Sequence, residues 1–312
     1  MVDTALSHRP VLLTETLAAL EIRPGGRYVD ATFGCGGHAA AILERLGPEG
    51  KLLALDRDPE AERRAMARFG GDDRFDFVRA AFSRLAGVIA ECGWSGRVSG
   101  ILFDLGVSSP QLDDAARGFG FGRDGPLDMR MDPTVGSGAA EWLDRVAEAE
   151  LDRVLAEFGE ERFHRRIVRS IIAARRQAPI ATTARLAEIV AAAVPTREPG
   201  KHPATRAFQA IRIAINDELG ELRAVLPQAV AVLAPGGRLA VISFHSLEDR
   251  MVKRFVREQA RGRELPLDLP VAGAPEGKTL RLVGRPARPG AAEVSTNPRA
   301  RSATLRVAER LG

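Results

Sequence analysis

The order of hydrophobic and polar residues predicts alternating strands and helices along the first part of the chain. Short runs rich in aliphatic and aromatic residues predict strands at 28–30, 52–55, 75–78 and 100–105. Apolar residues at helical spacing predict helices at 14–20, 38–46, 59–69 and 83–92. Thr14 is the expected N-cap of the first helix. This alternation with short connections predicts an α/β fold with a parallel, doubly wound sheet.

The alternation stops after Asp104, because residues 111–200 carry several helical patterns and no convincing strand. It resumes with a long helix, 204–233, that we expect to be kinked near Pro227. The remaining expected elements are a strand at 238–243, a helix at 247–261, a Pro- and Gly-rich stretch at 262–278, and strands at 280–283 and 303–308. We expect the last strand to be antiparallel and to pair between the two before it.

This pattern divides the chain into a core and an insert. We expect the core domain to comprise residues 1–110 and 201–312. The insert, residues 111–200, is expected to be an all-α subdomain that recognises the substrate.

The composition is that of an ordinary enzyme, with 312 residues and 45% hydrophobic content. No run approaches the roughly 18 apolar residues of a membrane span, and the N-terminus lacks a signal-peptide pattern, so we expect a cytoplasmic protein without a membrane partner. Cys35 and Cys92 are not in a paired spacing, and no His or carboxylate spacing indicates a metal site. From Arg250 onward, 14 Arg and Lys stand against six Asp and Glu, which is compatible with nucleic-acid binding or with a genome that favours arginine codons.

A glycine-rich turn lies between the first strand and the following helix. Gly34, Gly36 and Ala39 fit the G-x-G-x-x-G/A pattern of nucleotide-binding turns. Asp56 ends the next strand about twenty residues later, where a carboxylate can accept both ribose hydroxyls. A dinucleotide and S-adenosyl-L-methionine both remain candidates. Asp30 favours S-adenosyl-L-methionine, because a carboxylate attracts sulfonium and ammonium groups but repels a pyrophosphate.

A second polar segment follows the fourth strand: Asp104, then Ser108, Ser109, Pro110 and Gln111. Ligands of open α/β sheets bind beyond the carboxyl ends of the strands, so this segment and the glycine turn should share one cleft. Oxygen acceptors there can hold an exocyclic amine of a base against a methyl donor. The alternative is a polar turn that merely ends a strand. The ring that stacks on the base would come from Phe119, Phe121, Trp142 or Phe244.

Several motifs together are similar to the RsmH (MraW) family. They are the segments 30–38, 104–113, 125–131, 201–206 and 243–249. The resemblance covers almost the whole chain. It implies a class I (Rossmann-like) S-adenosylmethionine-dependent methyltransferase that modifies the N(4) amine of a cytidine in the decoding centre of bacterial 16S ribosomal RNA.

The resemblance also implies roles for individual residues. Gly36, Gly37 and His38 would contact the methionine part of S-adenosyl-L-methionine, Asp56 its ribose and Phe82 its adenine. Asp104 and Gln111 would complete that cofactor site. The residues alone would place His38 on the surface and Phe82 in the core.

The expected reaction is direct in-line transfer of the methyl group to the amine, with no covalent enzyme intermediate. The candidate catalytic residues are Asp104, Ser108, Ser109 and Pro110. Methylation at ring carbon 5 would instead need a cysteine thiolate, and neither Cys35 nor Cys92 is well placed for it.

Basic residues in and near the insert are candidate RNA contacts. Arg162, Arg165, Arg166 and Arg169 repeat at about helical spacing, opposite Phe163, Ile167 and Ile171. They form either an RNA-binding stripe or a solvated face balanced by Glu160 and Glu161. The remaining candidates are His202, Arg206 and His245, where each histidine either contacts substrate or orders a loop.

Two rival functions stay open: a noncatalytic ribosome-assembly factor and a nicotinamide-dependent oxidoreductase. Asp30, the Ser109-Pro110 step and the family resemblance favour the methyltransferase over both. The sequence decides neither between naked RNA and an assembling or assembled small subunit nor whether the protein is a homodimer.

Overall fold

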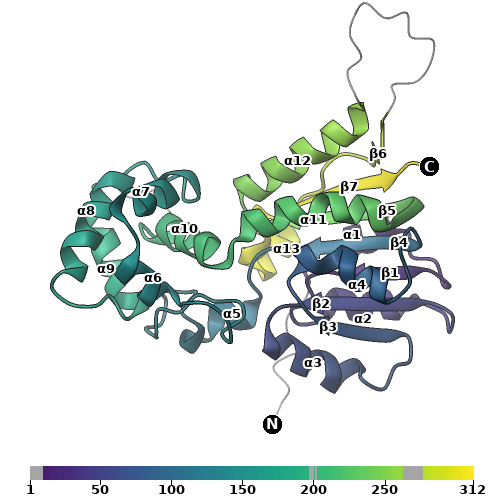
Figure 1. Ribbon diagram of the computed structural model, residues 1–312, viewed down its shortest axis with the longest axis horizontal. Coiled ribbons are helices and arrows are strands. Elements are labelled where there is room, and N and C mark those ends of the chain that lie inside the picture. Colours follow the sequence, from purple (N-terminus) through teal and green to yellow (C-terminus); the bar gives the residue numbers. More distant parts are fainter. Residues whose placement is uncertain (1–9, 197–199, 201, 263–276) are drawn as a thin grey trace, which may run out of the picture. The chain divides into compact units, whose positions relative to one another are not determined.

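The computed structural model describes residues 10–196, 200, 202–262 and 277–312. The chain forms two compact units, one of residues 1–106 with 219–312 and one of residues 107–218 (Figure 1). Most of the stretch 262–278 lies outside the described residues, so the expected lack of regular structure there is not tested. None of the helices in the described part of the chain combines the length and the apolar character needed to cross a membrane.

The first unit is built on a mixed sheet with, among its described residues, seven strands in the order β3-β2-β1-β4-β5-β7-β6 (Figure 1). The strands are β1 (Arg27–Asp30), β2 (Lys51–Asp56), β3 (Phe75–Arg79), β4 (Val98–Asp104), β5 (Leu233–Ser243), β6 (Leu280–Leu282) and β7 (Thr304–Arg310). Strands β1 to β5 pair in parallel, and β7 is antiparallel to both β5 and β6. The expected parallel core and the antiparallel final strand between its two predecessors are confirmed.

Helices cover both faces of this sheet. They are α1 (Leu13–Leu20), α2 (Gly37–Leu43), α3 (Pro59–Phe69), α4 (Leu85–Glu91), α11 (Glu218–Val232), α12 (Ser246–Arg261) and α13 (Ala291–Thr296), with short 3₁₀ turns at Phe82–Arg84 and Pro298–Ser302. Leu53 and Ile101 enter one hydrophobic cluster with α4, α11 and α12. Their neighbours Leu52 and Leu102 enter another with α1, α2 and α3. Because successive side chains of a strand point to opposite faces, strands that are apolar throughout are buried on both sides, as a doubly wound fold requires.

Three local expectations were wrong. The N-cap of α1 is Leu12, in the left-handed region and without a side-chain cap, rather than Thr14. The long helix expected at 204–233 is interrupted at Asp217, whose φ of 48° cannot continue a right-handed helix. Pro227 lies inside α11, and the kink expected there stays a prediction. Strand β5 begins earlier than expected, since Val98 pairs with Leu233 and the next pair joins Gly100 to Arg238 across a register shift.

The second unit is helical and has its own core. Its elements are α5 (Ser109–Asp113), the 3₁₀ turn Ala115–Arg117, α6 (Ala139–Arg145), α7 (Glu148–Glu157), α8 (His164–Arg175), α9 (Thr183–Ala193) and α10 (Thr205–Asn216). Among its described residues the one β-type pairing is the isolated bridge between Pro126 and Thr182. The expected combination of an α/β fold with an inserted all-α subdomain is thus present.

The boundaries of the insert differ from the expected 111–200. Helix α10, which the sequence pattern places in the core domain, buries Ala207, Phe208 and Ile211 in the hydrophobic cluster of the helical unit. The unit therefore runs from residue 107 to residue 218. The helical periodicity of α10 is equally compatible with either unit, so the sequence alone did not reveal where it packs.

Candidate functional site

Two left-handed glycines shape the turn between β1 and α2. Gly34 and Gly36 have φ values of 54° and 72°, in a region that side chains rarely enter. The Gly36 N–H closes the turn on the carbonyl of Phe33 at 2.7 Å. A Cβ on Gly36 would lie 2.5 Å from the Phe33 ring, and one on Gly37 would lie 2.3 Å from the Pro10 ring. Packing within the unit therefore requires glycine here, independently of any cofactor.

Asp56, at the end of β2, holds this turn in place. Its Oδ2 accepts a hydrogen bond of 2.8 Å from the Gly34 N–H, and its Oδ1 accepts one of 2.9 Å from the Asp58 N–H. Burial raises the pKa of Asp56, against the opposing effect of these two N–H donors. Asp56, which the sequence predicts to contact a ribose, thus also stabilises the glycine turn through its bond to Gly34. The ribose contact itself stays a prediction.

Asp30 and Asp104 end the neighbouring strands β1 and β4, and Thr32 connects them. Asp30 pairs with Leu102 in the parallel ladder. The Oδ1 of Asp30 accepts a bond of 3.2 Å from the Thr32 N–H, and the Thr32 Oγ1 accepts one of 2.6 Å from the Asp104 N–H. The fold thus brings together the two carboxyl groups that the sequence assigned to cofactor binding and catalysis.

The surroundings of both carboxyl groups raise their pKa values. Burial raises the pKa of Asp30 to about 7, with Thr32 opposing the shift and repulsion from Asp56 adding to it. Burial also raises the pKa of Asp104 well above its ordinary value, and the carboxylates of Asp30 and Glu248 raise it further. The buried Oδ1 of Asp104 has no hydrogen-bond partner among the described residues. A cation or an N–H donor beside Asp104 would satisfy this oxygen and favour the ionised form, so the pair fits a positively charged donor such as S-adenosyl-L-methionine.

His38 is the second residue of α2 and is buried, with 5% of its surface exposed. Its Nε2 lies 3.2 Å from the carbonyl of Val11, and its Nδ1 lies 3.6 Å from the Oδ2 of Asp104. Burial lowers the pKa of His38 to about 4, so the ring is neutral at pH 7 and its Nε2–H donates to Val11. The unprotonated Nδ1 then faces Asp104. The residues alone placed His38 on the surface, and that interpretation was wrong.

Phe82 lies in the short turn before α4 and is half-buried. Its ring packs edge-on against Phe103, with centroids 5.8 Å apart and an interplanar angle of 84°. It also contacts the hydrophobic cluster on that face of the sheet. Part of the Phe82 ring therefore packs in the hydrophobic core, as the residues alone predict. The contact with adenine stays a prediction.

Ser108, Ser109, Pro110 and Gln111 belong to the helical unit and form the start of α5. Ser108 is the N-cap and forms a capping box with Gln111, whose Oε1 accepts a bond of 2.8 Å from the Ser108 N–H. The buried side chain of Gln111 thus stabilises the helix start. Part of the polar character that suggested substrate contacts therefore serves this cap.

The four aromatic candidates for base stacking differ in their surroundings. Phe119 is 5% exposed within the core of the helical unit, so its ring faces are covered. The Phe121 ring packs against His202 and Phe208, and Trp142 is partly buried on the same cluster. Phe244, in the first unit, is partly buried. Phe119 is thus the most buried of the four, and the identity of the stacking ring stays a prediction.

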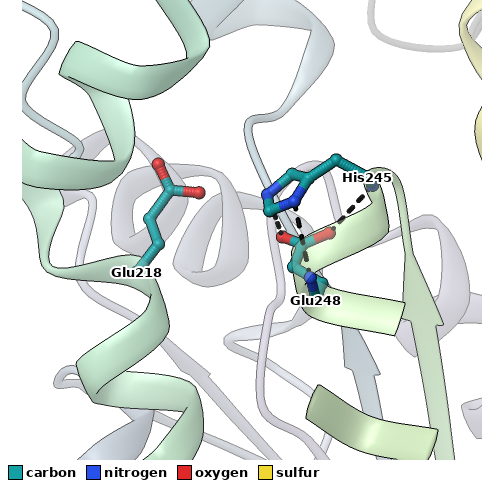
Figure 2. A group of neighbouring side chains, drawn as sticks. All are labelled: Glu218, His245 and Glu248. Carbon is teal, nitrogen blue, oxygen red and sulfur yellow. Dashed lines mark hydrogen bonds and ion pairs between the residues drawn. The ribbon is translucent and has the colours of Figure 1, made fainter. Parts of the chain in front are cut away.

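His245 is the N-cap of α12, and Figure 2 shows its contacts with Glu248. The Nδ1 of His245 accepts a bond of 3.4 Å from the Glu248 N–H. The Oε2 of Glu248 accepts bonds from the N–H groups of Phe244 and His245, at 2.8 and 3.3 Å. His245 Nε2 lies 3.2 Å from Glu248 Oε1. This reciprocal cap supports the loop-ordering interpretation of His245, while the predicted RNA contact stays a prediction.

Helix α8 has the expected apolar and basic faces. Ile167 and Ile171 are buried, and the side chains of Arg165, Arg166 and Arg169 are exposed. None of these three arginines forms an ion pair with an acidic side chain among the described residues. Glu161 is one of the two acidic residues expected to balance this face, but it is buried and accepts a hydrogen bond from the backbone N–H of Phe163.

Three other candidate RNA contacts line a single pocket in the helical unit. Arg162, His202 and Arg206 surround a cavity of about 180 Å³, together with Glu161 and Phe163. Arg162 precedes the first residue of α8 in the sequence, so it is not part of that helix. Its guanidinium is 5.4 Å from the centre of the Phe163 ring. The sequence did not predict that Glu161 lines this pocket, because an acidic residue in a basic segment is typical of a surface counter-charge.

Comparisons with known proteins identify the family. The model of the MraW methylase family matches residues 5–311. Ribosomal RNA small subunit methyltransferase H of Thioalkalivibrio sulfidiphilus is 62% identical over 308 residues and covers 98% of each chain. The protein of the same name from Nitrosococcus oceani is 58% identical over 305 residues and covers 97% of each chain. A solved rRNA methylase from Streptococcus thermophilus is 12% identical, with a TM-score of 0.42 over 96% of this chain and 93% of that one.

The match spans both units, and it agrees with the doubly wound fold. The predicted methyltransferase class and the predicted donor, S-adenosyl-L-methionine, are confirmed with it. The chain belongs to the MraW methylase family.

Proposed function

We propose that this chain transfers a methyl group from S-adenosyl-L-methionine to the N(4) exocyclic amine of a specific cytidine in the decoding centre of 16S ribosomal RNA. The similar proteins from Thioalkalivibrio sulfidiphilus and Nitrosococcus oceani are each named ribosomal RNA small subunit methyltransferase H, which supports this substrate class. The substrate is this RNA in an assembling or assembled small subunit, so the protein acts in the cytoplasm.

The carboxyl group of Asp104 carries the proposal, because its side chain is 26% exposed and its Oδ1 has no hydrogen-bond partner among the described residues. A cytidine amine has two N–H bonds, and its nitrogen is weakly nucleophilic because the lone pair is delocalised into the ring. An oxygen acceptor aligned on one N–H orients that lone pair and accepts the proton that the amine loses on methylation. When bound, S-adenosyl-L-methionine supplies an electrophilic methyl group.

The other residues at the strand ends would hold the donor. Asp30 offers its carboxylate to positive charge, and the turn at Gly36 and Gly37 brings backbone close to the ligand. His38, Asp56 and Phe82 are proposed to contact the cofactor as the family resemblance implies. The roles of Ser108, Ser109, Pro110 and Gln111 remain a proposal from the sequence.

The two cysteines support transfer without a covalent intermediate. Attack on ring carbon 5 of cytosine needs a thiolate, which proteins obtain by lowering the pKa of a cysteine. Burial instead raises the pKa of Cys35, with charged neighbours contributing less. Burial also raises the pKa of Cys92, with repulsion from Asp76 and Glu91 adding to it.

The test is methyl transfer from tritiated S-adenosyl-L-methionine to small-subunit RNA, naked and in isolated subunits, with the modified nucleoside identified by mass spectrometry. We expect N(4)-methylcytidine from the wild-type protein. Asp104→Ala should reduce turnover roughly 100-fold or more, while thermal stabilisation by S-adenosylhomocysteine persists.

Two results would contradict the proposal. Full turnover by Asp104→Ala would remove the role of this carboxyl group. Absence of transfer to any small-subunit RNA would favour a noncatalytic assembly factor, and stabilisation by NAD rather than by S-adenosylhomocysteine would favour an oxidoreductase.

A further inference from the structure

The pocket in the helical unit has the size and the chemistry of a site for one nucleobase. It lies where the start of α8 meets the start of α10, and its volume is about 180 Å³. Pockets for drug-sized ligands measure roughly 300–1,000 Å³, so this one has room only for a smaller group. Its lining combines a carboxylate, two guanidinium groups and two rings, contributed by Glu161, Arg162, Phe163, His202 and Arg206.

Glu161 is the unusual member of this lining. It is 7% exposed, although carboxylates are seldom so buried without partners. Its Oε1 accepts a bond of 2.8 Å from the Phe163 N–H. Its Oε2 has no hydrogen bond or ion pair to any residue that the structure describes. A ligand with adjacent N–H donors would satisfy both oxygens, and a buried charge-assisted pair of this kind is strong.

Guanine is the base whose edges match this arrangement. Its N1–H and N2–H groups lie side by side and can bond to the two oxygens of one carboxylate. Adenine and cytosine offer a single amine beside a ring acceptor, and uracil offers one N–H between two carbonyls, so a carboxylate would face an acceptor lone pair on each of them.

The two arginines supply hydrogen-bond donors of the kind that the other edge of guanine accepts. Its O6 and N7 are acceptors, and arginine is the side chain that most often pairs with them. Arg162 is exposed beside the Phe163 ring, and Arg206 donates a bond of 2.9 Å to the carbonyl of Glu160. That bond orients the Arg206 guanidinium at the wall of the pocket.

His202 provides a flat polar surface. Its ring lies 4.6 Å from the Phe121 ring at an interplanar angle of 32°, which fixes its plane. Its Nδ1 accepts a bond of 3.2 Å from the Ala204 N–H, so in the neutral ring the proton is on Nε2 and available to an acceptor on a ligand. Unstacked bases of single-stranded RNA commonly stack on such rings.

We propose that this pocket binds the base of one guanine nucleotide in a single-stranded part of the RNA substrate, separate from the methylated cytidine. The inference rests on the proposed function, because it takes RNA as the substrate. The helical unit would thereby read sequence rather than only phosphate charge, and Glu161 would be the residue that selects guanine.

Binding of short RNAs to the full-length protein tests this proposal. The probes are fluorescent uridine heptamers with guanosine, inosine, adenosine, cytidine or uridine at the centre, measured by fluorescence anisotropy. We expect the guanosine heptamer to bind roughly 5- to 100-fold more tightly than the uridine one, because one well-formed bidentate base contact discriminates by that factor. Inosine, which lacks the N2 amine, should fall between them.

Glu161→Gln is the decisive variant, because an amide oxygen can still accept the Phe163 N–H while the second carboxylate oxygen is replaced by a donor. This variant should lose the guanosine preference and keep the affinity for the uridine heptamer. Glu188→Gln, at an exposed position of α9 in the same unit, should behave as the wild type. Equal binding of all five heptamers by the wild type, or a guanosine preference retained in Glu161→Gln, overturns the proposal.

The methyl-transfer assay separates this inference from the proposed function. If the wild type methylates a cytidine amine but shows no guanosine preference, the pocket proposal is wrong and the proposed function stands. If the wild type prefers guanosine but transfers no methyl group to small-subunit RNA, the pocket proposal stands as RNA recognition and the proposed function is wrong.

Discussion

The Oγ1 of Thr32 accepts a hydrogen bond of 2.6 Å from the backbone N–H of Asp104. The bond connects the end of β4 to the turn that follows β1. This bond fixes the backbone of the residue that we propose as the proton acceptor. Thr32 itself was not among the site residues predicted from the sequence.

We expect Thr32→Val to lower turnover while leaving the fold intact. Valine keeps the shape of threonine but removes the acceptor, so the Asp104 N–H loses its partner and the carboxyl group can shift. Loss of one such bond should cost about 1 kcal/mol in the free energy of unfolding measured with urea. Thr32→Ser keeps the hydroxyl and serves as the matched control. Equal kcat values for the valine and serine variants would show that this bond does not position Asp104.

The buried carboxyl group of Asp30 should make the protein without cofactor less stable as the pH rises. Its pKa is about 7 in the folded protein against an ordinary value of 3.8. Between these two values only the folded state retains the proton, so the free energy of unfolding falls by roughly 1.4 kcal/mol per pH unit from this group.

Asp104 and Asp56 should also lower the free energy of unfolding as the pH rises, as Asp30 does, because burial raises the pKa of each. His38 acts oppositely below about pH 6.5, since its folded pKa is lowered to about 4. Urea unfolding of wild type and Asp30→Asn from pH 5 to pH 8 isolates Asp30, and the asparagine variant should show the flatter loss of stability. Asp73→Asn, at an exposed position, is the control. Parallel curves for wild type and Asp30→Asn would contradict the expectation.

One pair of variants can distinguish whether His245 contacts RNA or only orders the loop before α12. His245→Ala should lower the free energy of unfolding by about 1 kcal/mol, because the N-cap of α12 is lost. His245→Asn restores a good capping side chain and should recover that stability. We expect the KM for RNA to stay raised in both variants, because only the imidazole makes the proposed contact. A wild-type KM in His245→Asn would reduce His245 to a residue that orders the loop.

Reversing the charges on the exposed face of α8 should weaken RNA binding and its dependence on salt. Each phosphate contact to single-stranded RNA contributes about 0.7 to the slope of log K against log salt, so changing Arg165, Arg166 and Arg169 to Glu should lower its magnitude by roughly 2. The charge-reversal control is Arg185→Glu on α9, which has an ion pair with Glu188. An unchanged affinity and salt slope in the triple variant would assign these arginines to a solvated surface.

The strand ends of the candidate site were predictable because they depend on local patterns. Apolar runs that end in Asp30, Asp56 and Asp104 identify the parallel strands, and parallel strands place their carboxyl ends at one edge. The break at Asp217 was not predicted, because most aspartates adopt right-handed or extended backbone and the residue alone does not mark the helix end.

Features that depend on contacts between distant parts of the chain could not be predicted from the sequence either. His38 is buried because the carbonyl of Val11, from the segment before α1, lies over it. Glu161 is buried because the carboxylate folds onto the start of α8, although its local sequence is typical of a solvated turn. Neither environment leaves a signal in the spacing of nearby residues.

The position of the helical unit between β4 and β5 affects how the sheet is made during synthesis. Strand β4 ends at Asp104, and its partner β5 begins only at Leu233, so the ribosome must produce the whole insert before the two strands can pair. During that interval β4 is an open edge with unpaired backbone groups, the type of surface on which nascent chains aggregate. If the insert folds early, it replaces a long flexible loop between β4 and β5 by a compact unit. The loss of chain entropy on pairing the two strands is then smaller.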